Sequence, residues 1–122
     1  MKISFTDRES DIMHVLWERG PSVVSDVQKQ LKDKLAYTTV LTMLRTLEGK
    51  GYVGHEEEGR QHRYFATVQQ QAAQKSALKH LLGKYFKDSS ELLFARLVTD
   101  QKLSSEEIRR MRKLLAGKSQ EK

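Results

Sequence analysis

The sequence predicts a mainly α-helical protein with one small β-hairpin, in which a first lobe that contains the hairpin is followed by a lobe of three helices. Apolar residues recur at helical spacing both before and after the hairpin. Two strand-like segments lie between these helical patterns, and the composition shifts to glutamine and alanine after Thr67. We therefore expect two domains, residues 1–68 and residues 69–122.

Composition excludes several classes of protein. Of the 122 residues, 38% are hydrophobic and 31% are charged. No apolar run approaches the ~20 residues that a membrane-spanning helix needs. The chain has no cysteine, which excludes disulfides, thiolate catalysis and cysteine-rich metal sites. No secretory signal is visible, so we expect a cytoplasmic protein without membrane insertion.

The net charge of +6 is unevenly distributed along the chain. Residues 1–68 contain ten Lys or Arg and ten Asp or Glu, whereas residues 69–122 contain twelve and six. Within the first segment, cations outnumber acids between Lys29 and Lys50. Nucleic-acid binding therefore cannot be inferred from the net charge, and it depends on how charge is distributed within the first lobe.

The first lobe is expected to begin with two helices and a short strand between them. Thr6, with a glutamate three residues later, is the pattern of a capping box, and Gly20-Pro21 is a stop signal for the helix that follows. Residues 22–24 are rich in β-branched side chains and predict the strand. The second helix is expected over about residues 24–33.

The third helix, between Leu35 and Tyr52, is expected to have two different sides. Its apolar side is formed by Val40, Leu44 and Leu47. Its polar side is formed by Thr38, Thr39, Thr42 and Arg45. Threonine is a mediocre helix former, whereas hydroxyls, methyl groups and a guanidinium together suit the base edges and phosphates of a DNA major groove. DNA readout is therefore expected here, and burial of the helix on both sides is the alternative.

Two strand-like segments, residues 52–55 and residues 61–66, are expected to form a hairpin with the loop between them. The order helix, short strand, helix, helix, hairpin is that of a winged helix-turn-helix, with the hairpin as the wing. The loop contains three consecutive glutamates, which are expected to face away from phosphate. Contacts with the DNA backbone are expected from Arg45, Lys50 and Arg60.

Three helices are expected in the second lobe. The first follows Gln69, and the other two begin at serine caps, Ser89-Ser90 and Ser104-Ser105. A segment of about fifty residues buries too little surface to close a stable core alone. A second copy of the chain would supply the missing cover, so we expect a homodimer. Folding of these helices back onto the first lobe is the alternative.

Neither a metal site nor a catalytic site is expected. His55 and His62 fall where they could face each other across the hairpin, but two histidines without further ligands make a weak zinc site. The sequence has no glycine-rich phosphate loop and no nucleophile paired with a base. We therefore expect no cofactor and no enzymatic activity.

Several of these segments together resemble the BlaI/MecI/CopY family of bacterial transcriptional repressors. The most specific are Tyr37-Thr38-Thr39-Val40-Leu41-Thr42-Met43-Leu44 and the Lys50-Gly51-Tyr52 stop, with Ile12 to Trp17 and Glu58-Gly59-Arg60 in support. The resemblance implies a winged-helix operator-binding lobe followed by a dimerisation lobe, with Thr39 and Thr42 at the groove-facing positions. Some members carry a lysine at the position of Thr38. Copper-sensing members carry a Cys-x-Cys tail, so copper sensing is not expected.

The resemblance also implies a function, namely a homodimeric repressor that binds an inverted-repeat operator in double-stranded DNA. Members of the antibiotic-resistance type are relieved by cleavage after a membrane-bound sensor protease detects its signal. By register, the scissile Asn-Phe pair of those members falls on Arg96-Leu97, and neither residue matches it. Release by a small ligand is therefore an alternative, and so is a winged helix used for protein contacts.

Overall fold

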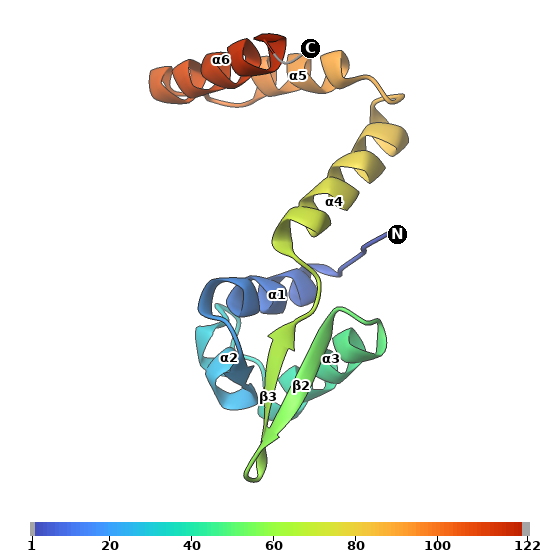
Figure 1. Cartoon of the computed structure of the whole chain (residues 1–122), viewed down its shortest axis with the longest axis vertical. Helices are drawn as coiled ribbons and strands as arrows, with labels where there is room; N and C mark the ends of the chain where they lie inside the picture. Colours follow the sequence, from blue (N-terminus) through green and yellow to red (C-terminus); the bar gives the residue numbers. More distant parts are fainter. Residues whose placement is uncertain (1, 121–122) are drawn as a thin grey trace. The chain divides into compact units, whose positions relative to one another are not determined.

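The structure is a computed structural model that describes residues 2–120, and within that range it contains six α-helices and a three-stranded sheet (Figure 1). The helices are α1 (Asp7–Arg19), α2 (Val24–Gln30), α3 (Tyr37–Gly49), α4 (Gln70–Tyr85), α5 (Ser90–Asp100) and α6 (Ser105–Gln120). The strands are β1 (Ser22–Val23), β2 (Val53–Glu58) and β3 (Gln61–Ala66), antiparallel in the order β1-β3-β2. The predicted fold class is confirmed.

The chain divides into two compact units, residues 1–78 (unit 1) and residues 79–122 (unit 2). Unit 1 contains α1 to α3, the sheet and the first part of α4. Unit 2 contains the end of α4 together with α5 and α6. Within residues 2–120, none of the helices combines the length and the apolar character that crossing a membrane requires.

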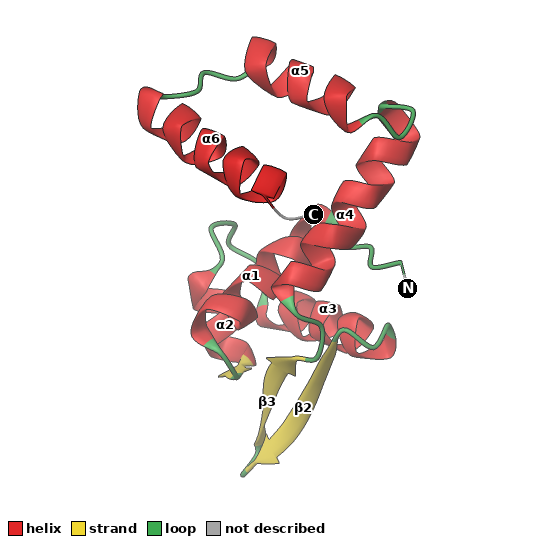
Figure 2. Ribbon diagram, turned by 45° about the horizontal axis from the view of Figure 1, so that its top comes forward, coloured by secondary structure: helices red, strands yellow, loops and turns green. Residues whose placement is uncertain are grey.

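Unit 1 has one closed hydrophobic core. Val40, Leu44 and Leu47, which were expected to face inward on α3, are buried at 0% exposure, and so is Ile12 of α1. Val27 of α2 and Tyr64 of β3 belong to the same cluster. Figures 1 and 2 show the hairpin of β2 and β3 projecting beyond the three helices, as the wing of a winged helix does.

Local sequence signals set where the helices of unit 1 begin and end. The Glu9 N–H donates to Thr6 Oγ1 at 3.1 Å and the Thr6 N–H donates to Glu9 Oε1 at 2.8 Å, so the expected capping box begins α1. Gly51 follows α3 at φ +85°, a left-handed conformation that favours glycine. α2 ends at Gln30, before the expected residue 33: Leu31 is in an extended conformation, at φ −75° and ψ 138°, and packs against the core from outside the helix.

The wing is longer, and its turn tighter, than the sequence predicts. β2 continues to Glu58, which leaves a two-residue turn at Gly59-Arg60, with Gly59 at φ +63°. The prediction of a loop over residues 56–60 is therefore wrong. The acidic residues of this segment take part in the strand: the register places Glu56 opposite Arg63, and the Arg63 guanidinium forms an ion pair with Glu58, two residues further along β2.

Unit 2 has capped helices but no closed core. Ser104 and Glu107 form the expected capping box of α6, with both hydrogen bonds at 3.1 Å. Ser89 Oγ accepts from the Leu92 N–H at 3.0 Å at the start of α5. No residue between positions 79 and 118 is buried. The large apolar side chains exposed in this range are Leu81, Tyr85, Leu92, Phe94, Leu97, Val98, Ile108, Leu114 and Leu115.

Candidate nucleic-acid interface

α3 has one buried side and one exposed side, as its sequence predicts. The apolar side is fully enclosed in the core of unit 1. The residues of this helix that were predicted to contact DNA are all exposed, and they are Thr38, Thr39, Thr42 and Arg45. Thr46 is exposed as well and lies one helical turn after Thr42. That spacing of four residues is the sequence signal by which Thr46 could have been included.

Two threonine hydroxyls on this side are hydrogen-bonded to the helix itself. Thr42 Oγ1 donates to the Thr38 carbonyl at 2.8 Å, and Thr46 Oγ1 donates to the Thr42 carbonyl at 3.0 Å. Each bond reaches back by one turn and selects one rotamer of a β-branched side chain. Thr42 and Thr46 therefore present fixed side-chain orientations on the polar side of α3.

The start of α3 is suited to an anion. Its N-cap residue is Ala36, which provides no side-chain hydrogen bond, and the first turn contains no acidic residue. The amides of this turn therefore lack a capping side chain, and the helix dipole adds positive potential to them. A DNA phosphate is the kind of acceptor that such a helix end can bind.

Lys50, directly after α3, is held by an ion pair within unit 1. Its Nζ lies 3.0 Å from both carboxylate oxygens of Glu9, whose side chain is almost fully buried. Burial raises the pKa of the Glu9 carboxyl, but hydrogen bonds from the Thr6 N–H and from Lys50, with the charge of Lys50, outweigh it and hold the pKa below its usual range. The partners are 41 residues apart, so sequence spacing gives no sign of the pair. A phosphate contact by Lys50 stays a prediction.

The two arginines of the wing differ in their surroundings. Arg60 is exposed at the two-residue turn, where it forms no ion pair with any described residue. Arg63 forms an ion pair with Glu58 and donates from Nη1 to the Pro21 carbonyl at 3.2 Å. The guanidinium of Arg60 is therefore the more accessible of the two, and its DNA contact stays a prediction.

A pair of histidines connects the wing to α3. His55 Nδ1 lies 2.7 Å from Glu48 Oε2, and the rings of His55 and His62 stack with their centroids 4.4 Å apart. The strand register places His55 opposite Tyr64, so the two histidines are diagonal neighbours. Burial raises the pKa of the Tyr64 hydroxyl, and the nearby Glu48 carboxylate adds to that effect. Among the described residues, no three potential ligands are grouped so as to hold a metal ion.

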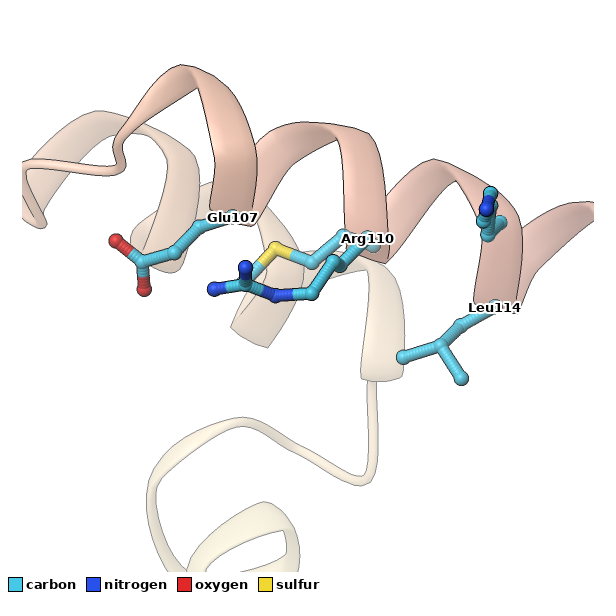
Figure 3. Close-up of a pocket in the computed structure, with 5 residues that line it drawn as sticks. Glu107, Arg110 and Leu114 are labelled. Carbon is cyan, nitrogen blue, oxygen red and sulfur yellow. The ribbon is translucent and has the colours of Figure 1, made fainter.

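Unit 2 contains apolar hollows instead of a closed core. α5 and α6 together line a groove of about 680 Å³. Its apolar lining consists of Phe94, Val98, Leu103, Ile108, Met111 and Leu115. A second hollow, of about 540 Å³, lies along α6, where Figure 3 shows Glu107, Arg110 and Leu114 on one side of the helix. Apolar side chains of unit 2 therefore line open hollows instead of a closed core.

The residues predicted as a cleavage position lie within a formed helix. Arg96 and Leu97 are both in α5, where Arg96 Nη1 donates to Asp100 Oδ2 at 3.1 Å. Leu97 is 40% exposed. Cleavage of the peptide bond between Arg96 and Leu97 would require α5 to open locally, because the backbone groups of this helix are hydrogen-bonded to one another.

Comparison with known proteins covers most of the chain. A model of the penicillinase repressor family matches residues 5–117. The methicillin resistance regulatory protein MecI of Staphylococcus aureus is 20% identical over 112 residues, which cover 90% of this chain and 91% of MecI. A MarR family protein from Bacillus stearothermophilus has a similar fold, with a TM-score of 0.53 at 19% identity over 98% of this chain and 76% of that protein. Reduced AbfR bound to DNA gives a TM-score of 0.53 at 25% identity over 79% and 75% of the two chains.

The family match and the observed fold agree. The matched residues extend from before α1 into α6, so they include parts of both units. The similar solved structures are winged-helix regulators, and the helices and wing of unit 1 follow that arrangement. The chain therefore belongs to the penicillinase repressor family.

Proposed function

We propose that this protein is a homodimeric transcriptional repressor that binds an inverted-repeat operator in double-stranded DNA. The observation that carries the proposal is the exposed threonine and arginine side of α3, on a winged-helix unit whose core encloses the other side of the same helix. An α-helix fits the width of the major groove, where base edges can be distinguished. Membership of a repressor family supports the same function.

The residues of unit 1 divide into two roles in this proposal. Base edges are contacted by Thr39 and Thr42, with Thr38 beside them in the first turn of α3. Phosphates are contacted by Arg45, Lys50 and Arg60. Phosphate contacts supply affinity for any sequence, whereas base contacts supply the preference for the operator. Among the three proposed phosphate contacts, Lys50 contributes least, because Glu9 already neutralises its charge.

A second copy of the chain is proposed to cover unit 2. Residues 79–118 bury no side chain on their own, although nine of their large apolar side chains are exposed. Apolar surface of this extent on a small helical segment is typical of a protein–protein interface. Dimerisation also explains why the operator is expected to be an inverted repeat, since a two-fold dimer presents two copies of α3.

Selection of duplexes from a random library by the full-length protein tests the DNA-binding part. We expect one class of sequences with dyad symmetry. Thr42→Ala should weaken binding to the selected site by about 1–3 kcal/mol and leave binding to random DNA nearly unchanged. Arg60→Ala should weaken both and lower the slope of log affinity against log salt by about 1. Equal losses of Thr42→Ala on both DNAs would contradict base reading.

Analytical sedimentation tests the dimer. The full chain should sediment as a dimer at micromolar concentration, and a chain ending at Leu78 should be a monomer. The truncated protein should also bind the selected site ~100-fold more weakly or worse, because two tethered reading heads bind with a high effective concentration. A monomeric full chain at micromolar concentration would rule out the proposed dimer.

Two routes for ending repression follow from unit 2. Cleavage at Arg96-Leu97 by a membrane-bound sensor protease would separate α6 from most of α5 and weaken the dimer. A small apolar ligand in the groove between α5 and α6 would compete with the second copy for the same surface. Protein cut near Arg96 should run as a monomer and lose the operator. Cut protein that remains dimeric and bound would leave ligand-driven release as the proposed route.

A further inference from the structure

The Thr42 hydroxyl has its hydrogen committed to the backbone of its own helix. Its Oγ1 lies 2.8 Å from the Thr38 carbonyl oxygen, to which it donates. A threonine in a helix has two common χ1 rotamers, and this bond selects the one that turns the oxygen back toward the preceding turn. The hydroxyl branch of Thr42 is therefore engaged by the backbone, the methyl branch takes no part in a hydrogen bond, and the residue is exposed.

A base that required a proton from Thr42 would have to compete with this bond. The exchange would replace one hydrogen bond with another, and it would also reorient a stiff side chain. A methyl-to-methyl contact requires neither change. In the major groove, the thymine C5-methyl is the apolar group that distinguishes T·A from the other base pairs. The oxygen still has lone pairs, so Thr42 offers a methyl group and an acceptor but no free donor.

We propose that Thr42 recognises a thymine in each operator half-site by contact between its methyl group and the thymine C5-methyl, and not by donating a hydrogen bond. The inference rests on the proposed function, since it assumes that α3 enters the major groove. It deepens that function by naming the base and the chemistry of its recognition. Thr39 provides the contrast, because no side-chain hydrogen bond within residues 2–120 engages its hydroxyl, which is free to donate.

Two substitutions at residue 42 separate the methyl group from the hydroxyl. Thr42→Val keeps the methyl at the same branch and removes the hydroxyl, whereas Thr42→Ser keeps the hydroxyl and removes the methyl. Replacing thymine by uracil in the DNA removes only the C5-methyl of the base. The site selected by the wild-type full-length protein is scanned with uracil at each thymine, symmetrically in both half-sites. Thr46→Val is the matched control, because it removes the same kind of backbone hydrogen bond one turn later.

The expected result is a coupling between residue 42 and one thymine. Thr42→Val should bind within about 2-fold of the wild type, whereas Thr42→Ser should lose about 4-fold for each half-site, the change expected when one methyl group is no longer withdrawn from water. Uracil at the recognised thymine should cost the wild type and Thr42→Val a similar factor. The same uracil should weaken binding by Thr42→Ser only slightly, since this variant has already lost the methyl contact.

The opposite pattern overturns the inference. Wild-type-like binding by Thr42→Ser together with a loss of about 10-fold or more by Thr42→Val would assign recognition to the hydroxyl. Equal sensitivity of all three proteins to uracil at every position would show that residue 42 contacts no thymine methyl. Thermal unfolding of Thr42→Val and Thr46→Val shows whether either change alters α3 itself. If the wild type selects no sequence at all, the proposed function fails first and this inference falls with it.

Discussion

Unit 1 and unit 2 are built from helices with the same kind of apolar periodicity, yet only unit 1 closes a core around it. Leu44 of α3 has no exposed surface, whereas Leu114 of α6 is 74% exposed. The difference lies in what surrounds each helix. The three helices of unit 1 pack on one another and on the sheet, whereas α5 and α6 line an open groove. An apolar stripe therefore predicts a buried side of a helix, but it does not say which molecule covers it.

The largest expected effect is the contrast between two leucine truncations. Leu44→Ala should lower the free energy of unfolding of unit 1 by about 2–5 kcal/mol, because it leaves a cavity in a closed core. Leu114→Ala should change the unfolding of the dissociated chain by only about 0.5 kcal/mol or less, since the side chain is already exposed. Denaturant unfolding at several protein concentrations measures both, with the Leu114→Ala effect growing as the dimer forms.

Equal effects of the two truncations at low protein concentration would mean that unit 2 has a core of its own. A Leu114→Ala effect that stays small at high concentration would place this residue outside the dimer interface. The first outcome would contradict the difference in burial between the two units. The second would contradict the proposal that a second copy of the chain covers Leu114.

A smaller effect, dependent on pH, is expected from the ion pair that connects α1 to the end of α3. Glu9→Gln keeps the size of the side chain and removes its charge, so it should cost unit 1 about 1–3 kcal/mol at pH 7. The folded pKa of Glu9 is lowered, so its stabilisation is fully present above the unfolded value, near pH 4.3, and is lost as the pH falls through the folded value. The difference between wild type and Glu9→Gln should therefore shrink below about pH 4.5.

Unfolding free energies measured from pH 3 to pH 7 check this prediction. Glu18→Gln is the matched control, since it changes an exposed glutamate at the other end of the same helix. A difference between wild type and Glu9→Gln that is constant over this range would show that the charge of Glu9 has no part in the stabilisation.

Much of unit 1 could be predicted because its signals are local. The capping box at Thr6 and the left-handed Gly51 each depend on residues close in sequence. The ion pair between Glu9 and Lys50 could not be predicted, because it forms only when the fold brings together residues 41 positions apart. The predicted length of the wing was wrong, because three consecutive glutamates are typical of a loop in the sequence. Only the folded hairpin places the residues of β3 opposite them.

The candidate site likewise has features that helical spacing predicts and features that only the folded structure shows. Helical spacing placed the threonines of α3 on one side, and the structure confirms that they are exposed. Spacing could not show that the Thr42 hydroxyl is turned onto the Thr38 carbonyl, because a threonine in a helix has two common rotamers. It also could not separate Arg60 from Arg63, since only the folded hairpin places Glu58 and the Pro21 carbonyl beside Arg63.

The smallest expected effect concerns where unit 1 ends, which sequence composition places at residue 68 and the contacts of the structure place at Leu78. Ser76 of α4 binds the N-terminal segment: the Ile3 N–H donates to Ser76 Oγ at 2.9 Å, and Ser76 Oγ donates to the Ile3 carbonyl at 3.3 Å. Ser76→Ala should therefore lower the stability of unit 1 by about 0.5–1.5 kcal/mol. Ser90→Ala, at an exposed position of α5, is the control and should have almost no effect. If unfolding of unit 1 responds equally to both changes, the start of α4 adds nothing to unit 1, and the boundary belongs near residue 68.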